Sequence, residues 1–502
     1  MSHNPNPFDF VPFAEEPTLN TIEKWMSFGE TRTGRITVEM KALTPVHIVG
    51  EQPLEKINGR EGKNIKESRF YQRNGKYFIP GSSIRGVLRG FIEAACNGWA
   101  SQLTPYYEKE KEKHAIGFKV VDSETDSSID IDLNLPSAIN QKFTVPSSAE
   151  KGIDLATFLF GYIPSKPLEK NQFHPAWKSR IIIDDAEFNG SMLSSVERED
   201  CPKVPDLHNQ KAFMGGPHPR ATSWWYQFPK EIRKDQYGAY KFIGSGFRGR
   251  KFYFHQNPAN CINYYATTQK WQRNSKGEHK LYFFPLECLK QGESISFDLL
   301  FNGIPEELLS LLCFALEPGK NIRHKIGYGK AYGYGSVEFS IVKVEYKSKG
   351  LEELKEAAID EIRASIGEQF KAFSRSKAEG FIQFLDRAAL DKLSFILWYD
   401  EISKCIFTYP FAGTGGFNVD LNKHDRNEHN RQVKTAIEGA LNSMKIKIPN
   451  IKTVSKVDPA LEEIISRNAS LLEHKPTLHF EVYQEQSNLD EDIKEQRKFN
   501  YD

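Results

Sequence analysis

Two separated parts of this 502-residue chain show the same succession of hydrophobic periods: strand, helix, strand. In the first part, alternating apolar residues from Gly34 to Ala42 predict a half-buried strand. An apolar i, i+3, i+4, i+7 stripe then predicts a helix from Ser82 to about Cys96, and a further strand is predicted over residues 179–188. Because side chains repeat every two residues in a strand and about every 3.6 in a helix, each change of period marks a boundary.

The second part begins with alternation over residues 281–301 and continues with a helix that opens at Pro305 and ends at Leu316. Alternation from Val337 to Tyr346 predicts the last strand. Strand, helix, strand, followed by strand, helix, strand, is the split β-α-β order of ferredoxin-like and RNA-recognition folds. The expected fold class is therefore α+β, with a ferredoxin-like or RNA-recognition-like core.

The rest of the chain is expected to surround this core, which spans residues 34–346. Residues 1–33, rich in Pro, Asn and Phe, are interpreted as an irregular N-terminal arm. A basic and aromatic stretch, about 190–280, is interpreted as a large insertion between the two halves. After the core the composition shifts, so we expect a mainly helical C-terminal domain over 347–490 and a disordered tail over 491–502.

Charge is unevenly distributed, although the net charge is only +1. Residues 201–280 hold fourteen Lys and Arg against four Asp and Glu, a balance of +10, whereas residues 461–502 hold five against ten, a balance of −5. Such local charge, more than the total, decides where a polyanion binds. The chain has no C-x-x-C pair, no signal-peptide pattern and no apolar run near the ~20 residues that span a bilayer. We therefore expect a cytoplasmic protein without a zinc site or a membrane partner.

The opening segment, residues 81–89 (GSSIRGVLR), begins the first predicted helix. Free N–H groups at a helix N-terminus suit a phosphate, and Ser82 or Ser83 is expected to cap this helix. Arg85 and Arg89 are four residues apart, so they should project together. These groups suit a nucleic-acid backbone, which is held mostly by such contacts. The alternative is an ordinary capped amphipathic helix with solvated arginines, which the local pattern fits equally well.

The glycine segment, residues 326–335 (IGYGKAYGYG), precedes the last predicted strand. Its four glycines allow a close backbone approach or a positive φ. Tyr328, Tyr332 and Tyr334 suit stacking on bases, and Lys330 suits a phosphate. The segment has no Gly-Lys-Ser/Thr of a phosphate loop, and it precedes a strand, unlike a dinucleotide fingerprint. The alternative is a glycine-rich hairpin with tyrosines in the core.

The insertion interleaves cations with aromatic residues. Arg248, Arg250 and Lys251 stand beside Phe252 and Tyr253. Cations combined with aromatic rings form a plausible surface for single-stranded RNA. The alternative is a solvated charged face over a small satellite core. Because the charge imbalance is largest here, we favour contact with RNA or with another subunit.

Five segments follow one another along the chain in a fixed order. They are TPVHIVG (44–50), IPGSSIRGVLRG (79–90), FLFG (158–161), SRIIIDDAEF (179–188) and IGYGKAYGYGSVEF (326–339). Together they resemble the RAMP superfamily of CRISPR-associated proteins, over about residues 33–346. The motifs NPFDFVPF (6–13) and GFRGRKFYFHQ (246–256) are similar to those of a long subfamily found in type III, III-D-like, systems.

The resemblance implies a backbone subunit that grips CRISPR guide RNA and presents it to target RNA beside other effector subunits. In this reading His47 matches the histidine of the family's first-strand motif. The residues that we predict to contact RNA are His47, Ser82, Ser83, Arg85, Arg89, Arg248, Arg250, Lys251, Tyr328, Lys330 and Tyr332.

The chain departs from the family in one respect that concerns catalysis. Backbone subunits that cut target RNA carry an Asp after the first-strand motif, and residues 51–76 contain none. This stretch holds Glu51, Glu55, Glu61 and Glu67, whose longer side chains would change the geometry. We therefore expect no catalytic residue, no metal and no cofactor.

Two alternatives stay open. The first is a RAMP endoribonuclease that uses His47 on guide precursor, or a glutamate of residues 51–67 on target RNA. The second is an interaction scaffold, in which the insertion and the C-terminal region bind protein neighbours and RNA contact is incidental.

Overall fold

The computed structural model describes separate stretches of the chain between residues 7 and 407. The longer stretches are 7–50, 67–102, 116–121, 128–133, 152–163, 176–198, 200–206, 249–268, 282–348, 353–373, 380–400 and 402–407. The shorter ones are 56–57, 60–61, 143, 145, 226–227, 231–234, 240–243 and 246–247. All six elements predicted for the core lie within these residues.

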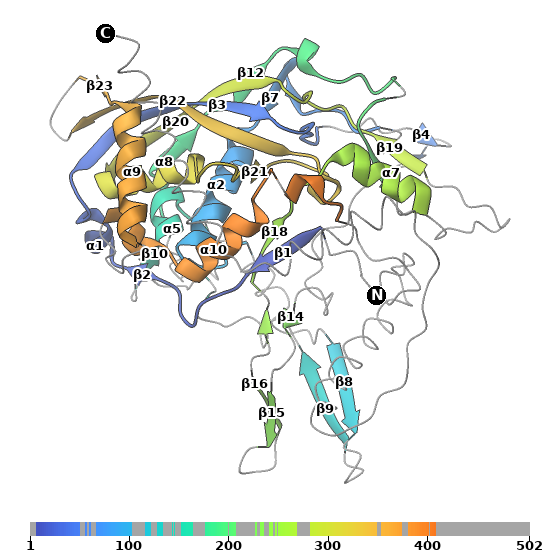
Figure 1. Cartoon of the computed structure of the whole chain (residues 1–502), viewed down its shortest axis with the longest axis horizontal. Coiled ribbons are helices and arrows are strands. Elements are labelled where there is room, and N and C mark those ends of the chain that lie inside the picture. Colours follow the sequence, from blue (N-terminus) through green and yellow to red (C-terminus); the bar gives the residue numbers. More distant parts are fainter. Residues whose placement is uncertain are drawn as a thin grey trace.

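A six-stranded antiparallel sheet lies at the centre of the described residues (Figure 1). In spatial order its strands are β11 (Ile181–Ile183), β20 (Ser294–Pro305), β3 (Thr31–Ala42), β22 (Ser336–Ser348) and β21 (His324–Lys325), with β23 (Lys355–Glu356) paired to the far end of β22.

Two helices connect these strands, α2 (Gly81–Ala95) and α8 (Glu306–Leu316). The chain order is β3, α2, β11, then β20, α8, β22, whereas the spatial order of the strands is β11, β20, β3, β22. The first strands of the two halves, β3 and β20, therefore lie side by side in the middle of the sheet. This interleaving of two β-α-β units confirms the predicted α+β fold with a ferredoxin-like core.

One face of the sheet is apolar because alternate residues of each strand point the same way. Ile36, Val38 and Met40 of β3 are fully buried, and Phe297 of β20 lies opposite Val38. Helices α2 and α8 cover this face, below the sheet in Figure 1. Helix α8 is apolar on almost all sides, as expected for a helix enclosed in a core. Truncating a fully buried side chain such as Leu312 to Ala is expected to cost about 3 kcal/mol.

Four more helices extend this layer, and parts of the N- and C-terminal regions belong to it. They are α1 (Ile22–Met26), α5 (Leu155–Phe160), α9 (Ile359–Phe373) and α10 (Arg387–Ile396). Helix α9 packs on α8 and β22, and α10 packs on α2. The described residues after 352 thus pack against the core. The domain boundary near 347 stays a prediction, and residues 408–502 lie outside the described residues.

The strand predicted over residues 179–188 is in fact two strands. Strand β11 pairs with β20, whereas β12 (Ala186–Phe188) pairs with β7 (Lys76–Ile79), which in turn pairs with β6 (Gln72–Arg73). Asp184 and Asp185 lie between β11 and β12, and the Asp185 carboxylate accepts a hydrogen bond from the Gly81 N–H at 2.8 Å. The change of pairing partner coincides with that long-range contact, which the local alternation does not reveal.

Described residues of the N-terminal arm form short strands, where we had expected irregular structure. Strand β1 (Phe8–Val11) pairs with β18 (Arg250–Tyr253), and β2 (Leu19–Asn20) pairs with β10 (Ile153–Asp154). Trp25 in α1 is fully buried and donates from Nε1 to the Ile153 carbonyl at 2.9 Å. The apolar residues of this region are therefore part of the core.

The remaining elements lie mostly in the insertion and its surroundings. They are β4 (Lys56–Ile57), β5 (Arg60–Glu61), β8 (Ile116–Val121), β9 (Ser128–Leu133), β13 (Lys203–Asp206), β14 (Tyr226–Gln227), β15 (Glu231–Lys234), β16 (Tyr240–Ile243), β17 (Gly246–Phe247), α7 (Pro258–Thr268) and β19 (Tyr282–Pro285), with short 3-10 turns η2 (Gly190–Met192), η3 (Lys330–Tyr332), η4 (Gly380–Phe384) and η5 (Ile402–Lys404).

Candidate nucleic-acid interface

The glycine segment connects β21 to β22 and contains the turn η3. All four of its glycines have positive φ, between 73° and 94°. A Cβ on Gly327 would lie 2.3 Å from the His47 carbonyl oxygen, and one on Gly335 would lie 1.9 Å from the Ile326 carbonyl oxygen. Glycine is therefore required here for both its backbone conformation and its small size.

The glycine segment is attached to the residues that follow β3. The Tyr328 N–H donates to the His47 carbonyl at 2.8 Å, and the Gly335 N–H donates to the Pro45 carbonyl at 2.9 Å. The Thr44 hydroxyl donates to the Gly333 carbonyl at 2.9 Å. Two of the five segments that carry the family resemblance, 44–50 and 326–339, are thus in direct contact.

His47 lies beneath this contact and is fully buried. Its Nδ1 is 2.6 Å from the Glu287 carbonyl oxygen and its Nε2 is 2.8 Å from the Ser68 hydroxyl. Burial lowers the pKa of His47 to about 4, against the opposing effect of the Glu287 hydrogen bond, so the ring is neutral at pH 7. With both nitrogens engaged and no exposed surface, His47 supports the glycine segment and has no ring atom at the surface for RNA.

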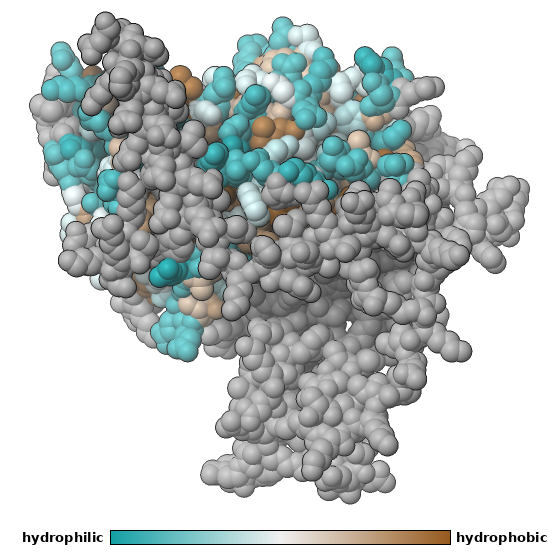
Figure 2. Space-filling model, viewed as in Figure 1, coloured by the Kyte–Doolittle hydropathy of each residue, from teal (hydrophilic) through white to brown (hydrophobic). Residues whose placement is uncertain are grey.

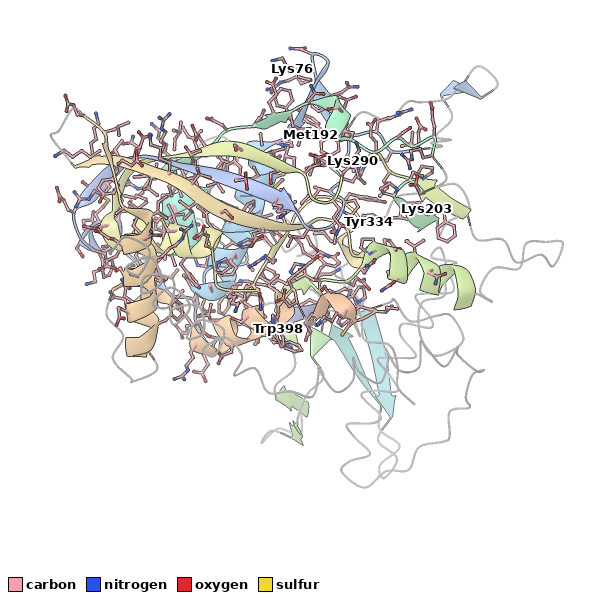
Figure 3. The ribbon with its side chains drawn as sticks, turned by 45° about the horizontal axis from the view of Figure 1, so that its top comes forward. Lys76, Met192, Lys203, Lys290, Tyr334 and Trp398 are labelled. Carbon is pink, nitrogen blue, oxygen red and sulfur yellow. The ribbon has the colours of Figure 1, made fainter. Side chains whose placement is uncertain are left out.

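The three tyrosines of the glycine segment have different environments. Tyr332 and Tyr334 are buried, and the Tyr334 hydroxyl bonds to the backbone of Lys203, donating to its carbonyl at 2.7 Å (Figure 3). Tyr328 is half-buried and contacts the His47 ring edge to face. Of the three predicted stacking residues, only Tyr328 has ring surface exposed in this structure.

Three lysines gather beside the glycine segment and form what we call the lysine cluster: Lys251 of β18, Lys325 of β21 and Lys330 of η3. Burial, and then the charge of Lys330, lower the pKa of Lys251 to about 7. The same two causes lower the pKa of Lys325 to about 7, and burial lowers that of Lys330. Burial is the largest cause of each of these shifts, so a phosphate close to the protonated amines would offset part of the cost of burying them.

Aromatic rings line the lysine cluster. The Lys251 ammonium lies 3.9 Å from the ring centroid of Phe8 and 4.7 Å from that of Tyr253. The Lys330 ammonium lies 5.9 Å from the Tyr253 centroid. Pairing of β1 with β18 places Phe8 opposite Tyr253 and so brings the N-terminal residues to this site. Phe8 is buried and Tyr253 is partly exposed, so Tyr253 is the ring here that could stack on a base, as aromatic rings beside cations do where proteins bind single-stranded nucleic acid.

Sequence reasoning missed Lys325 and the contribution of Phe8. Lys325 occupies a two-residue strand, which is too short to show a period, and its only local signal is its place just before Gly327. Phe8 lies in a motif that we used only for the family resemblance.

The opening segment is built differently from the prediction. Pro80 is the N-cap residue of α2 and makes no side-chain cap, so neither Ser82 nor Ser83 caps the helix. The carboxylate of Asp185 binds the Gly81 N–H and also pairs with Arg73 at 3.0 Å. Ser82 is exposed and Ser83 half-buried. An internal carboxylate thus already lies at the helix N-terminus where we expected a phosphate.

Arg85 and Arg89 project together, as expected, but toward the C-terminal end of α5. Arg85 donates to the Phe160 carbonyl, and Arg89 donates to the Gly161 carbonyl at 2.6 Å and to buried Glu93 at 2.8 Å. Cations at a helix C-terminus complement its exposed carbonyls and dipole. The two guanidinium groups therefore have a structural role that local sequence does not show.

The insertion residues that we predicted to bind RNA also differ in their burial and contacts. Lys251 is half-buried in the lysine cluster. Arg250 is buried, with its guanidinium donating to the Gly98 carbonyl and lying 4.4 Å from the Phe13 ring centroid. Burial lowers the pKa of Arg250 to about 10. Arg248 lies outside the described residues.

The open face of the sheet offers no aromatic platform of the kind that RNA-recognition folds use. In the described strands its centre holds ion pairs: Arg35 with Glu345 at 2.6 Å, and Lys343 with Glu345 at 2.8 Å and Glu356 at 3.5 Å. Figure 2 shows a largely hydrophilic surface along this side of the molecule. Since Arg35 and Lys343 are already paired with carboxylates, the centre of this face is a poor site for a phosphate backbone.

The structure describes only some of the glutamates that the sequence offered as candidate catalytic groups. Glu67 is paired with Arg69, and Glu51 and Glu55 lie outside the described residues. In the part of the chain that the structure describes, no group of three His, Cys, Asp or Glu could hold a metal ion. Across the same residues, no helix is long and apolar enough to cross a membrane.

Comparison with known proteins agrees with this core. Residues 39–338, more than half of the chain, match the family model described as RAMP superfamily. The chain belongs to the RAMP superfamily. The matched region runs from β3 to the start of β22 and so includes both the opening segment and the glycine segment of the RAMP core. Family membership supports a CRISPR-associated role.

Two further comparisons say less about the chain than the family match does. A chain in a solved structure titled "Type IV-B CRISPR Complex" is similar at 14% identity, over 64% of this chain and 92% of that chain, with a TM-score of 0.22. That overlap is too low to say more about this RAMP protein. No curated protein matches its sequence.

Proposed function

We propose that this RAMP protein binds CRISPR guide RNA as a backbone subunit of a type III effector ribonucleoprotein and presents the guide to target RNA. The observation that supports the proposal most directly is the lysine cluster beside the glycine segment. Burial lowers the pKa of all three lysines, the charge of Lys330 lowers those of Lys251 and Lys325 further, and a phosphate backbone that approaches them would offset these costs. Tyr328 and Tyr253 supply ring surface next to these charges.

Binding of this kind is largely independent of RNA sequence, because the contacts are to phosphates and ring faces. Target sequence is then read by base pairing with the guide. The type III assignment, including its III-D-like character, rests on the similarity of residues 6–13 and 246–256 to a long RAMP subfamily. Such a complex acts in the cytoplasm, in antiviral defence and together with other effector subunits.

Ultraviolet crosslinking of the protein to a radiolabelled single-stranded guide RNA, with the crosslinked peptides mapped, tests the proposal. We expect crosslinks at Tyr328 and Tyr253, an affinity that falls steeply with salt, and intact RNA on the same gel. Absence of binding at low salt, or crosslinks confined to the open sheet face, would contradict it. Discrete cleavage products from the wild type would instead move the protein to the endoribonuclease class.

A further inference from the structure

The last described residues of the chain begin beside residues 321–323, which precede the glycine segment. Residues 397–399 pair with residues 321–323: the Arg323 N–H donates to the Leu397 carbonyl at 2.9 Å, and the Tyr399 N–H donates to the Asn321 carbonyl at 2.7 Å. Trp398 lies on the side of the molecule away from the open sheet face (Figure 3). Beyond it the chain, coloured orange in Figure 1, turns toward α7 and ends its described part at Phe407.

Gln256 joins this C-terminal stretch to the glycine segment. Its side chain is fully buried. Its Nε2 donates to the Ala331 carbonyl of the glycine segment at 2.7 Å, and its Oε1 accepts from the Phe407 N–H at 2.8 Å. A carboxamide is the uncharged side-chain group that donates and accepts in this way at one end. Both of its polar atoms therefore hold backbone groups from two distant parts of the chain.

Packing reinforces the hydrogen bonds. The Phe407 ring stacks on that of Phe254, with centroids 4.4 Å apart and planes at 14°. A Cβ on Gly333 would lie 2.5 Å from the Gln256 carbonyl oxygen, so the two backbones are in close contact. Phe254 and Gln256 directly follow the residues of β18 that include Lys251 and Tyr253. The same short stretch thus carries part of the lysine cluster and the contact with the C-terminal residues.

We propose that Gln256 is a positioning residue through which the C-terminal stretch 397–407 sets the conformation of the RNA-binding glycine segment. The inference rests on the proposed function for the identity of the ligand. Because coupling between two sites is reciprocal, RNA that favours the ordered glycine segment also favours docking of Phe407.

Amide hydrogen exchange without RNA tests the coupling itself. In Gln256→Met, a neutral side chain of similar length loses both hydrogen bonds. We expect faster exchange in the peptides covering residues 326–335 and 402–407 together. The matched control is Gln383→Met, since Gln383 is exposed and only donates to the Gly380 carbonyl at 2.7 Å. Faster exchange at 402–407 alone would overturn the proposed coupling, whether or not the protein binds RNA.

A second variant keeps the test informative if Gln256→Met does not fold. Burial favours the protonated acid in Gln256→Glu, which can donate and accept as the amide does. We expect it to retain wild-type protection at about pH 6 and to lose protection in both peptides as the acid ionises toward about pH 9. Unchanged protection at both pH values would also overturn the proposal.

RNA affinity then separates the two hypotheses. We expect Gln256→Met to bind guide RNA about tenfold more weakly than the wild type, with Gln383→Met unchanged. If the glycine segment loosens and affinity stays the same, Gln256 does not position an RNA site. If the wild type itself binds no RNA, the proposed function fails, and the exchange data still decide the coupling.

Discussion

The opening segment of α2 and the glycine segment carry cations that look alike in the sequence, yet the fold uses them in opposite ways. Arg89 of the opening segment lies against the carbonyls that end α5 and against the Glu93 carboxylate. Lys330 of the glycine segment lies among lysines and aromatic rings, with its pKa lowered by burial. The arginine completes an internal structure, whereas the lysine brings its charge close to two other lysines.

This difference shows that the partner of a cation decides its role more than its spacing does. Arg85 and Arg89 do share one side of a helix, but a helix C-terminus and a buried carboxylate already occupy that side. Lysines from three separate elements meet at the glycine segment, and burial is the largest cause of the lowered pKa of each. Removing cations from the two regions should therefore change different properties.

The largest expected effect is a loss of stability when Arg89 of the opening segment is replaced. Arg89→Ala leaves Glu93 buried without its cation and the Gly161 carbonyl without its donor, and we expect a loss of about 3 kcal/mol in the free energy of unfolding. RNA affinity of the folded protein should stay close to that of the wild type. Chemical denaturation measures the first quantity and fluorescence anisotropy the second.

Arg35→Ala is the matched control, since Arg35 pairs with Glu345 on the exposed sheet face. Its unfolding midpoint should change little. An Arg89→Ala protein that keeps its stability but loses RNA affinity would return the opening segment to the role that the sequence suggested.

The next largest effect is a loss of RNA affinity when lysines of the lysine cluster are replaced. Lys251→Ala combined with Lys330→Ala should weaken guide-RNA binding at least about tenfold and reduce the slope of log affinity against log salt by about 1.4, roughly 0.7 for each lost phosphate contact. Lys343→Ala serves as the control because Glu345 and Glu356 already hold that charge on the sheet face. An unchanged slope in the double variant would show that RNA lies elsewhere.

How far the sequence predicts these two regions depends on the range of the interactions. The strand of β3 and the apolar stripe of α2 depend on periodicity within a few residues, so both were predicted correctly. The role of Arg85 depends on Phe160, and the break between β11 and β12 coincides with the contact of Asp185 with Gly81. Such contacts join residues about seventy to a hundred positions apart, and no local pattern encodes them.

Replacing Lys325 is expected to change stability by a smaller amount, and in the opposite direction from Arg89→Ala. The folded pKa of Lys325 is about 7, below its usual value, so the unfolded chain binds more protons between about pH 7 and pH 10. The free energy of unfolding contributed by this group therefore rises with pH across that window. Lys325→Met removes the buried charge, and we expect it to stabilise the protein by about 1 kcal/mol at pH 7.

Urea denaturation of the wild type and Lys325→Met at about pH 7 and pH 9 checks this sign. The advantage of the variant should shrink at the higher pH, because the wild-type lysine is then largely neutral in the folded protein. If the variant is less stable at pH 7, the 3.2 Å hydrogen bond from Lys325 to the Phe254 carbonyl outweighs the cost of burying the charge. Lys325 would then stabilise the fold through a backbone carbonyl, as Arg89 does.

The smallest effect is expected at the helix N-terminus, where the sequence predicted serine caps. Pro80 is the N-cap residue and Asp185 binds the Gly81 N–H, so Ser82→Ala and Ser83→Ala should each change the free energy of unfolding by less than about 0.5 kcal/mol. Asp185→Asn is the informative partner, since it weakens a charge-assisted bond to the helix and should cost about 1 kcal/mol. Should Ser82→Ala nevertheless weaken RNA binding while Asp185→Asn strengthens it, a phosphate and the Asp185 carboxylate compete for the same N–H groups. The opening segment would then be a second RNA contact beside the lysine cluster.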